Sequence, residues 1–340
     1  MSLMAVIDSS CKIAGLQDLT IHRTSSSVPF AGRYRLIDFP LSNLVNSGVT
    51  SVGVFPSYPF ASLMDHIGMG KSWDLDRRRD GLFFMPTTQR NGGYSTVGAF
   101  ASLEEHSHFF RKSKCEYVVI TNSFVITQLD YEDMLDFHKE SGADITQAMA
   151  DGVPLKSFIL SKKLLMNLIE THRDRRVISV EDVVKLQRKP FTFAEYQYAG
   201  YVAMIDSIQS YFSESLALLN QERRESLFLP DRPIFTKVKD EPPTRYVKGS
   251  RTKRAMVANG STINGSVTNC IIGRAVVIEE NTQVRNSLIM QKSYIEKNCD
   301  LSYVIADKEV HIEEGVSLHG TLEQPIVLRK GERVKKEDQI

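Results

Sequence analysis

The loop that follows the first apolar run of the chain carries residues that could either bind or exclude a phosphate group. Residues 4–7 form a short apolar run that predicts a strand, and the loop after it reads DSSCKIAGLQDLT. Nucleotide-binding proteins usually place glycines in such a loop, because backbone N–H groups must approach the phosphates closely. Here Gly15 is the only glycine, and Ser10, Cys11 and Ile13 carry side chains. The loop has the position of a phosphate-binding loop without its composition.

Cysteine and histidine offer little metal chemistry in this sequence. The cysteines are widely separated and form no C-x-x-C pair: Cys11, Cys115, Cys270 and Cys299. His106 and His108 form an H-x-H pair, but no third ligand follows at the spacing that zinc sites use. We expect buried or unreactive thiols, a polar helix end at the two histidines, and no metal site.

Composition excludes several classes of function. The 340 residues hold 42 Lys and Arg against 41 Asp and Glu, for a net charge of +1, which gives no sign of nucleic-acid binding. No apolar stretch approaches the ~20 residues of a membrane span, and no signal pattern opens the chain. We therefore expect a cytoplasmic protein with no membrane contact. Residues 1–3 are either native or an expression leader before Met4, and both alternatives stay open.

The first part of the chain alternates strand and helix patterns, which predicts an α/β fold with a doubly wound, mostly parallel sheet. Buried strands are expected at 50–55, 116–121 and 143–150, because these runs are rich in β-branched residues. Helices with recognisable ends or apolar faces are expected at 40–48, 130–142, 161–170 and 207–219.

The pattern changes after a segment with four prolines at 229–246. We expect an α/β domain at 1–228, a linker at 229–250 and a second domain at 251–340. In the second domain apolar residues recur every six positions, as in a parallel β-helix, in which each hexad forms one face of a triangular coil. The core positions expected from this spacing are Val257, Ile263, Ile272, Ile278, Val284, Ile295, Leu301, Ile312 and Leu318. The unpaired ends of such a coil favour an oligomer.

A family resemblance is carried by RTSSSVPFAGRYRLIDFPLSNLVNSGV at 23–49 and continues through DHIGMGKSWDL, VVITNSFVITQLDYEDMLDFHKESGADIT and AGYVAMIDSIQSYFSESLALL. The chain resembles ADP-glucose pyrophosphorylase, the glucose-1-phosphate adenylyltransferase family, over nearly its whole length, and most closely the accessory, GlgD-type branch. The resemblance implies a nucleotide-diphospho-sugar transferase-like (Rossmann-like) domain followed by a left-handed β-helix of hexapeptide repeats. Family enzymes join ATP to glucose 1-phosphate and release pyrophosphate.

The resemblance also implies which catalytic groups are replaced. The paired glycines of the family's phosphate loop fall on Ser10 and Cys11, its third glycine on Ile13 and its arginine on Gly15. A family lysine falls on Ser25. Positive charge and close backbone approach, which neutralise a triphosphate, are therefore both missing.

The metal-binding carboxylates of the family are replaced as well. One falls on Ser123 and the other on Met204, while Asp206 lies two residues later, ~7 Å along a strand, and is a poor substitute. The family's GTADA segment becomes residues 95–99. The segment that receives the sugar phosphate is deleted, and we interpret Lys156 at the junction as a solvated loop lysine. Mg²⁺ and ATP are expected only for the catalytic homologue.

Loss of these groups predicts an inactive chain. Removing one preorganised transition-state contact typically costs about 2.7–4 kcal/mol, so the combined loss should exceed ~10⁵ in rate even with strong non-additivity. The leading hypothesis is a non-catalytic regulatory subunit of glycogen biosynthesis that assembles with a catalytic ADP-glucose pyrophosphorylase subunit. A hetero-oligomer, expected as a tetramer, is the assembly that this implies, and a homo-oligomer stays possible.

Three alternatives remain open. The first is an active adenylyltransferase with rebuilt ligands, and the second is a hexapeptide acyltransferase that uses His311 or His319. In the third, a remnant pocket at Arg23, Arg33 and Arg35 binds a phosphate-bearing effector. We expect Arg33, Arg35, Asp38 and Asn43, which belong to the GRYRLIDFPLSN segment, to stabilise the fold or an interface.

Overall fold

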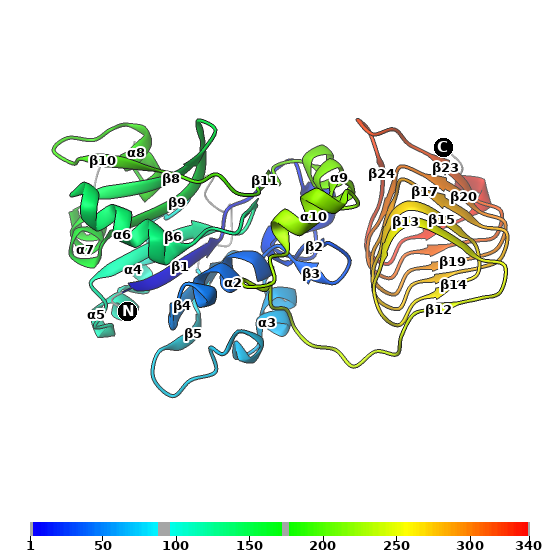
Figure 1. The fold of residues 1–340 in the computed structure, drawn as a ribbon, viewed down its shortest axis with the longest axis horizontal. Coiled ribbons are helices and arrows are strands. Elements are labelled where there is room, and N and C mark those ends of the chain that lie inside the picture. Colours follow the sequence, from blue (N-terminus) through cyan, green and yellow to red (C-terminus); the bar gives the residue numbers. More distant parts are fainter. Residues whose placement is uncertain (1–2, 88–95, 172–176, 339–340) are drawn as a thin grey trace.

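The computed structural model describes residues 3–87, 96–171 and 177–338. A sheet flanked by helices forms one end of the molecule and a solenoid of short strands forms the other (Figure 1). In the described part of the chain, no helix combines the length and apolar character needed to cross a bilayer.

The N-terminal sheet has seven strands in the order β10-β8-β9-β6-β1-β4-β5. Only β9 runs antiparallel to its neighbours, so the prediction of a doubly wound, mostly parallel sheet is confirmed. The strands are β1 (Leu3–Ser9), β4 (Ser51–Pro56), β5 (Gly81–Phe84), β6 (Tyr117–Asn122), β8 (Ile145–Ala150), β9 (Val153–Ser161) and β10 (Phe193–Gln197). Two small antiparallel pairs join β2 (Pro29–Phe30) with β3 (Tyr34–Arg35), and β7 (Val125–Ile126) with β11 (Ala203–Met204).

Helices pack around this sheet, and several end where the sequence predicts. In α6, Asp130 accepts from the N–H of Glu132 at the start, and Gly142 adopts a left-handed conformation after the end. The α-helices are α1 (Gln17–Thr20), α2 (Asp38–Asn46), α3 (Ala61–Ile67), α4 (Phe100–Glu105), α5 (Ser107–Lys112), α6 (Tyr131–Ser141), α7 (Lys162–Thr171), α8 (Val180–Lys185), α9 (Ile208–Ala217) and α10 (Gln221–Leu227). Short 3₁₀ turns occur at η1 (Ser25–Ser27), η2 (Lys71–Trp73) and η3 (Lys336–Asp338).

The C-terminal domain is a parallel solenoid, as the hexad pattern predicts. One face stacks β12 (Arg245–Tyr246), β14 (Thr262–Ile263), β16 (Val277–Ile278), β19 (Tyr294–Ile295), β22 (His311–Ile312) and β25 (Arg333–Val334). The other faces are formed by β13 (Arg251–Val257), β15 (Ser266–Ile272), β17 (Gln283–Arg285), β18 (Leu288–Ile289), β20 (Asp300–Ser302), β21 (Val304–Ala306), β23 (Ser317–His319) and β24 (Ile326–Leu328).

Coil length departs slightly from three hexads. In the middle of the solenoid, stacked residues such as Asn269 and Asn286 lie 17 positions apart, so one side of each coil is a residue shorter than a hexad. Eight of the nine expected core positions are buried, and Val257 is half-buried. The exception lies in the first coil, which has a neighbouring coil on one side alone.

The two domains share a hydrophobic core. Phe30 and Phe212 from the α/β domain belong to the same buried cluster as Ile271, Leu288 and Ile305 from the solenoid. Residues 229–244 form no helix or strand, yet the N–H of Phe235 donates to Ser42 Oγ on α2 over 2.9 Å. Strand β12 begins at Arg245, inside the 229–250 segment that the sequence suggests as a linker, because its residues already pair with β14.

Candidate functional site

The loop after β1 is held by a buried carboxylate. Asp8 accepts hydrogen bonds from the N–H and hydroxyl of Ser10, at 3.0 and 2.6 Å, and from the N–H of Gly98 at 2.8 Å. Burial raises the pKa of Asp8, and these hydrogen bonds oppose the rise. At least one backbone N–H of this loop, that of Ser10, therefore donates to the chain's own Asp8 side chain.

Cys11 is packed within the loop and is not activated as a nucleophile. Its thiol points to the carbonyl of Thr96 at 3.5 Å, and Ser25 Oγ donates to the Cys11 carbonyl over 3.3 Å. Burial, reinforced by Asp8 and Glu181, raises the pKa of the Cys11 thiol well above its usual value. A protonated, buried thiol is a poor nucleophile and a poor metal ligand.

Gly15 occupies a position where no side chain fits. An ideal Cβ at Gly15 would lie 2.4 Å from the carbonyl oxygen of Asp206 and 2.7 Å from Cα of Ser207. The close approach is fixed by the N–H of Ile208, which donates to the Gly15 carbonyl over 2.7 Å. The arginine that the family resemblance implies here therefore has no space for even its first side-chain atom.

Two serines meet where the resemblance implies a metal-binding carboxylate. The hydroxyls of Ser26 and Ser123 lie 2.6 Å apart, and both side chains are almost fully buried. Met204 pairs with Val125 in the β7–β11 ladder, so the two replaced metal positions lie in one neighbourhood. Hydroxyl and thioether groups offer Mg²⁺ none of the anionic oxygen ligands that it prefers.

Asp206 does not restore the missing carboxylate. It is exposed at the start of α9, where its Oδ1 accepts from Ser207 Oγ at 3.1 Å and its N–H donates to Ser210 Oγ at 3.0 Å. Across the described residues, no group of three His, Cys, Asp or Glu side chains is placed to hold a metal ion.

The interpretation of Lys156 as a solvated loop lysine is wrong. Its side chain is 28% exposed and forms an ion pair of 3.1 Å with Glu181, with its ammonium 5.5 Å from the ring centre of Phe124. Glu181 also accepts from the N–H of Val97 at 2.7 Å. The sequence could not pair these residues, because Glu181 joins the site through α8, far along the chain.

A cleft remains beside the altered loop. It has a volume of about 530 Å³, and its lining includes Cys11, Lys12, Ile13, Arg23 and Tyr58. Of the former GTADA positions, Ser95 lies outside the described residues, while Val97 and Ala99 are buried. The cleft thus persists without the loop glycines and arginine that the resemblance implies.

The candidate histidines of the solenoid lie on its outer faces. His311 Nε2 lies 2.6 Å from Glu296 Oε1, and His319 Nδ1 lies 2.9 Å from Ser302 Oγ. His106 is tied to the carbonyl of Pro86 at 3.1 Å rather than to a metal cluster. Neither solenoid histidine lines the cleft beside the altered loop, which gives no support to the acyltransferase alternative.

A second candidate site lies between the domains. We call it the interdomain cation cluster, which consists of Arg23, Arg35, Lys239, Arg274 and Lys308. All of these except Arg23 line a narrow cavity of about 40 Å³. The sequence singles out Arg23, Arg33 and Arg35 for a remnant pocket beside the former active site, without placing it between the domains. It gives no sign of Lys239, Arg274 and Lys308, which come from the linker segment and from solenoid corners.

The charges of this cluster are only partly compensated. Arg23 forms a buried ion pair with Asp307, yet its Nη1 has no hydrogen-bond partner. Lys308 is 6% exposed, and no acidic side chain of the described residues forms an ion pair with it. Burial, with Arg35 and Arg23 nearby, lowers the pKa of Lys308 to about 7, and burial lowers that of Arg35 to about 10.

Arg33 lines the same cavity and is tied to its neighbour. Its guanidinium lies 4.8 Å from the ring centre of Tyr34 and donates to the Tyr34 hydroxyl over 2.8 Å.

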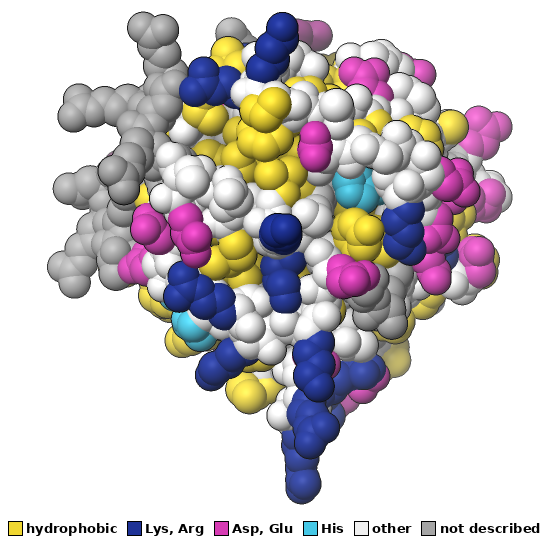
Figure 2. Space-filling view, turned by 90° about the vertical axis from the view of Figure 1, so that its left-hand side faces the viewer, with side chains coloured by type: hydrophobic (Ala, Val, Ile, Leu, Met, Phe, Trp, Pro, Cys, Tyr) yellow, Lys and Arg dark blue, Asp and Glu magenta, His cyan; other side chains and the backbone are white. Residues whose placement is uncertain are grey.

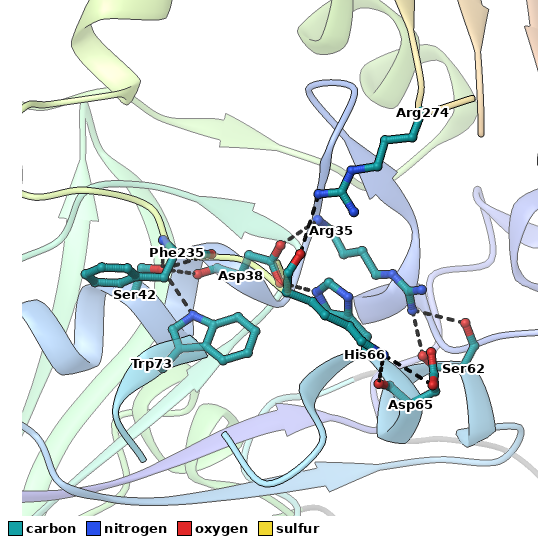
Figure 3. Close-up of polar contacts among 10 residues, drawn as sticks. Arg35, Asp38, Ser42, Ser62, Asp65, His66, Trp73, Phe235 and Arg274 are labelled. Atoms are coloured by element: carbon teal, nitrogen blue, oxygen red, sulfur yellow. Dashed lines mark hydrogen bonds and ion pairs between the residues drawn. The ribbon is translucent and has the colours of Figure 1, made fainter. Parts of the chain in front are cut away.

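A buried polar network positions Arg35 (Figure 3). Asp38 accepts from the N–H of Arg35 at 3.0 Å and lies 2.6 Å from His66 Nε2, while Arg35 Nη1 donates to the carbonyl of Ser62 over 2.6 Å. Asn43, also on α2, donates to the carbonyl of Thr127 over 2.9 Å. Burial lowers the pKa of His66, so its imidazole is neutral at pH 7.

Comparison with known proteins agrees with this architecture. Residues 14–157 match the nucleotidyl transferase family, and residues 242–324 match the GlmU-like C-terminal hexapeptide family. The glycogen biosynthesis protein GlgD of Bacillus subtilis (strain 168) is 44% identical over 97% of this chain and 96% of its own length. That of Geobacillus stearothermophilus is 46% identical, with the same two shares of 97% and 96%. The chain belongs to the GlgD family.

Catalytic relatives are more distant from this GlgD-family chain. The glucose-1-phosphate adenylyltransferase of Bacillus cereus (strain Q1) is 26% identical over 92% of this chain and 93% of its own length. The recognition of an ADP-glucose pyrophosphorylase relative of the GlgD type is therefore confirmed.

Proposed function

We propose that this chain is a non-catalytic accessory subunit in glycogen biosynthesis, which assembles with a catalytic glucose-1-phosphate adenylyltransferase and modulates its activity. The observation that carries the proposal is the buried pair of Ser26 and Ser123 hydroxyls, 2.6 Å apart, in place of a metal-binding carboxylate. Gly15 supports it independently, because the backbone of Asp206 and Ser207 closes the space that a phosphate-binding arginine would need. In this role the chain needs neither Mg²⁺ nor ATP and works in the cytoplasm.

The test mixes the purified chain with the catalytic adenylyltransferase of the same organism. Light scattering after size exclusion measures assembly, and pyrophosphate release from ATP and glucose 1-phosphate measures activity. We expect a heteromer and a changed kcat or KM of the catalytic subunit. Absence of both a heteromer and a kinetic change would overturn the proposal.

We further propose that the interdomain cation cluster, together with Arg33, binds a phosphate-bearing effector. The supporting observation is the buried Lys308 ammonium without an ion-pair partner, beside the unpaired Nη1 of Arg23. Unpaired buried cations are costly, and an anion that bridges the two domains would neutralise them.

Titration calorimetry with fructose 1,6-bisphosphate, ATP and ADP-glucose tests this binding. We expect at least one of these anions to bind, and binding to weaken at least tenfold in Arg35→Met. No heat with any of the three would count against an effector at this site.

A further inference from the structure

Lys156 lies on a bulge in β9. Its φ of 51° falls in the left-handed region, which a residue with a side chain rarely adopts within a strand. The register of β8 with β9 shifts between Gln147 and Met149, opposite the stretch that holds Lys156. A bulge of this kind changes the direction of a side chain, and bulges often occur next to active sites. The conformation of Lys156 therefore costs free energy that its contacts must offset.

The bulge places a positive charge beside a replaced metal position. Asn122 Nδ2 donates to the Lys156 carbonyl over 3.0 Å, which fixes the bulge next to Ser123. The ammonium lies 5.5 Å from the ring centre of Phe124, the residue that follows Ser123. The polypeptide itself thus supplies a cation in the neighbourhood where the resemblance implies a metal ion.

Two carboxylates lie close to the same loop as this cation. Burial raises the pKa of the Cys11 thiol, Asp8 and Glu181 raise it further, and Lys156 opposes the rise. All three charged groups therefore lie near enough to act on one buried thiol. A carboxylate in such a place needs a counter-charge, and Glu181 finds it in the Lys156 ammonium at 3.1 Å.

The ion pair continues into the backbone of residues 97 and 98. Glu181 contacts Lys156 through Oε1 and accepts from the N–H of Val97 through Oε2, at 2.7 Å. Asp8 accepts from the next N–H along the chain, that of Gly98, at 2.8 Å. Two adjacent amides are thus held by carboxylates from two separate elements, α8 and β1. We call these five residues the clamp.

The backbone supports the clamp on the α8 side. The N–H of Val180 donates to the Gly98 carbonyl over 3.1 Å, and the N–H of Phe100 donates to the Ile178 carbonyl over 2.8 Å. On the other side, the Cys11 thiol points to the Thr96 carbonyl. The segment that corresponds to the family's GTADA is therefore held between α8 and the loop after β1.

We propose that Lys156 is a positioning residue that acts as a built-in cation beside the replaced metal position: through Glu181 it locks residues 97–98 against the loop after β1. The clamp then holds this part of the α/β domain in one conformation without Mg²⁺ or nucleotide. The side chains at the replaced metal positions do not fit Mg²⁺, whereas a lysine on the chain supplies its charge permanently. The proposal concerns the isolated chain and is independent of the accessory role.

The contacts favour a clamp over a ligand-binding lysine. The Lys156 ammonium already has the Glu181 carboxylate as a partner and lies near the Phe124 ring. Lys156 lines neither the cleft beside the altered loop nor the interdomain cavity. A phosphate group that approached Lys156 would have to compete with a carboxylate that is itself held by the N–H of Val97.

The experiment measures hydrogen exchange at residues 97–98 in the full chain, by mass spectrometry of overlapping peptides. Lys156→Met removes the charge and keeps most of the side-chain length. Glu181→Gln removes the opposite charge and keeps an oxygen that can accept from Val97. Lys156→Arg is the conservative variant, because it restores a cation at the same position.

The matched control removes a positive charge that belongs to no clamp. Arg78→Met changes an exposed residue of the loop before β5, at the bottom of Figure 1. Figure 2 shows Lys and Arg side chains gathered on a projection at the lower edge of the end remote from the solenoid. A cation in such a place is solvated, so its loss should leave residues 97–98 unchanged.

We expect exchange at residues 97–98 to be at least tenfold faster in Lys156→Met than in the wild type and also faster in Glu181→Gln. Lys156→Arg and the control should stay near the wild type. The double variant should exchange no faster than Lys156→Met, because both substitutions break one pair. Thermal unfolding verifies that each variant is folded. Unchanged exchange in both single variants overturns the proposal, and so does a loss of protection that Lys156→Arg fails to restore.

A second measurement separates the clamp from a ligand site. Glucose 1-phosphate with Mg²⁺ should leave both the exchange at residues 97–98 and the melting temperature of the wild type unchanged. A rise in protection or melting temperature in the wild type that is absent in Lys156→Met would show that Lys156 binds the sugar phosphate, and would overturn the proposal. Neither measurement involves a partner, so the accessory role stands or falls separately.

Discussion

Ser26 and Ser123, 97 residues apart in the chain, share a hydrogen bond of 2.6 Å between buried hydroxyl groups. One hydroxyl donates to the other, so the pair stabilises the fold without offering a charge. A catalytic carboxylate in this position would need Mg²⁺ or solvent to balance it. The α/β domain thus keeps a transferase-like architecture, with a neutral hydrogen bond at the position where the resemblance implies a metal-binding carboxylate.

Placing a carboxylate at this position should cost stability and give no activity. We expect Ser123→Asp to lower the free energy of unfolding by about 1–3 kcal/mol, because it buries a charge beside a hydroxyl with no metal to bind. Ser123→Ala, the control, should cost about 1 kcal/mol through the lost hydrogen bond. Urea unfolding measures both, and an adenylyltransferase activity regained in Ser123→Asp would contradict this explanation.

Gly15 should tolerate no side chain, whatever its charge. The clash with Asp206 O and Ser207 Cα involves Cβ, so Gly15→Ala and Gly15→Arg should both destabilise by about 1–3 kcal/mol. If Gly15→Arg were as stable as the wild type and bound ATP more tightly than Gly15→Ala, the loop would still be a phosphate site. Thermal unfolding and calorimetry with ATP decide between these results.

The Arg23–Asp307 ion pair should hold the two domains together. We expect Arg23→Met to destabilise by about 3–5 kcal/mol, because it leaves the Asp307 carboxylate buried and unpaired. The double variant with Asp307→Asn should recover part of that loss. Equal stability of Arg23→Met and the wild type in urea would show that the pair contributes nothing.

Lys308 should make stability depend on pH in a predictable direction. Its pKa falls from 10.5 in the unfolded chain to about 7 in the fold, so the unfolded state binds the extra proton between these values. The contribution of Lys308 therefore destabilises the fold fully below pH 7, and this penalty decreases as pH rises toward 10.5. Lys308→Met should gain most stability over the wild type at pH 6 and progressively less at pH 8 and 9.

The same pKa predicts how the proposed effector responds to pH. A bound phosphate would favour the protonated ammonium of Lys308, so binding should take up a proton near pH 7 and weaken as pH rises above it. Calorimetry in buffers of different ionisation enthalpy measures this uptake. A stability difference between wild type and Lys308→Met that stays constant across pH would remove the basis for this prediction.

Much of the fold could be predicted from local patterns. The period of six located Ile278, Ile295 and Ile312 in the solenoid core, since each coil repeats one local geometry. The same period did not predict the partial exposure of Val257, because that depends on whether a coil also stacks on the other side of the first coil. Open ends are a property of the assembly rather than of the repeat.

The sites were harder to predict because their contacts span the chain. Resemblance singled out Ser123 as a replaced position, but its partner Ser26 and the role of Gly15 as a contact for Asp206 required three-dimensional packing. The sequence suggests a solvated Lys156 because its ion-pair partner, Glu181, lies in a later helix and is not visible from the local sequence. Lys308 carried no signal in sequence, since a single lysine at a turn is ordinary until two domains bury it.

Pyrophosphate release by the isolated chain, supplied with saturating ATP, glucose 1-phosphate and Mg²⁺, is the decisive measurement for the loss of catalysis in this chain. With no partner present, any turnover must come from this chain, and the family resemblance places the reaction beside residues 10–15 and Ser123. We expect a rate indistinguishable from the protein-free background at any concentration of the chain. A rate that rises in proportion to the amount of chain, and that the chelator EDTA abolishes, would contradict it.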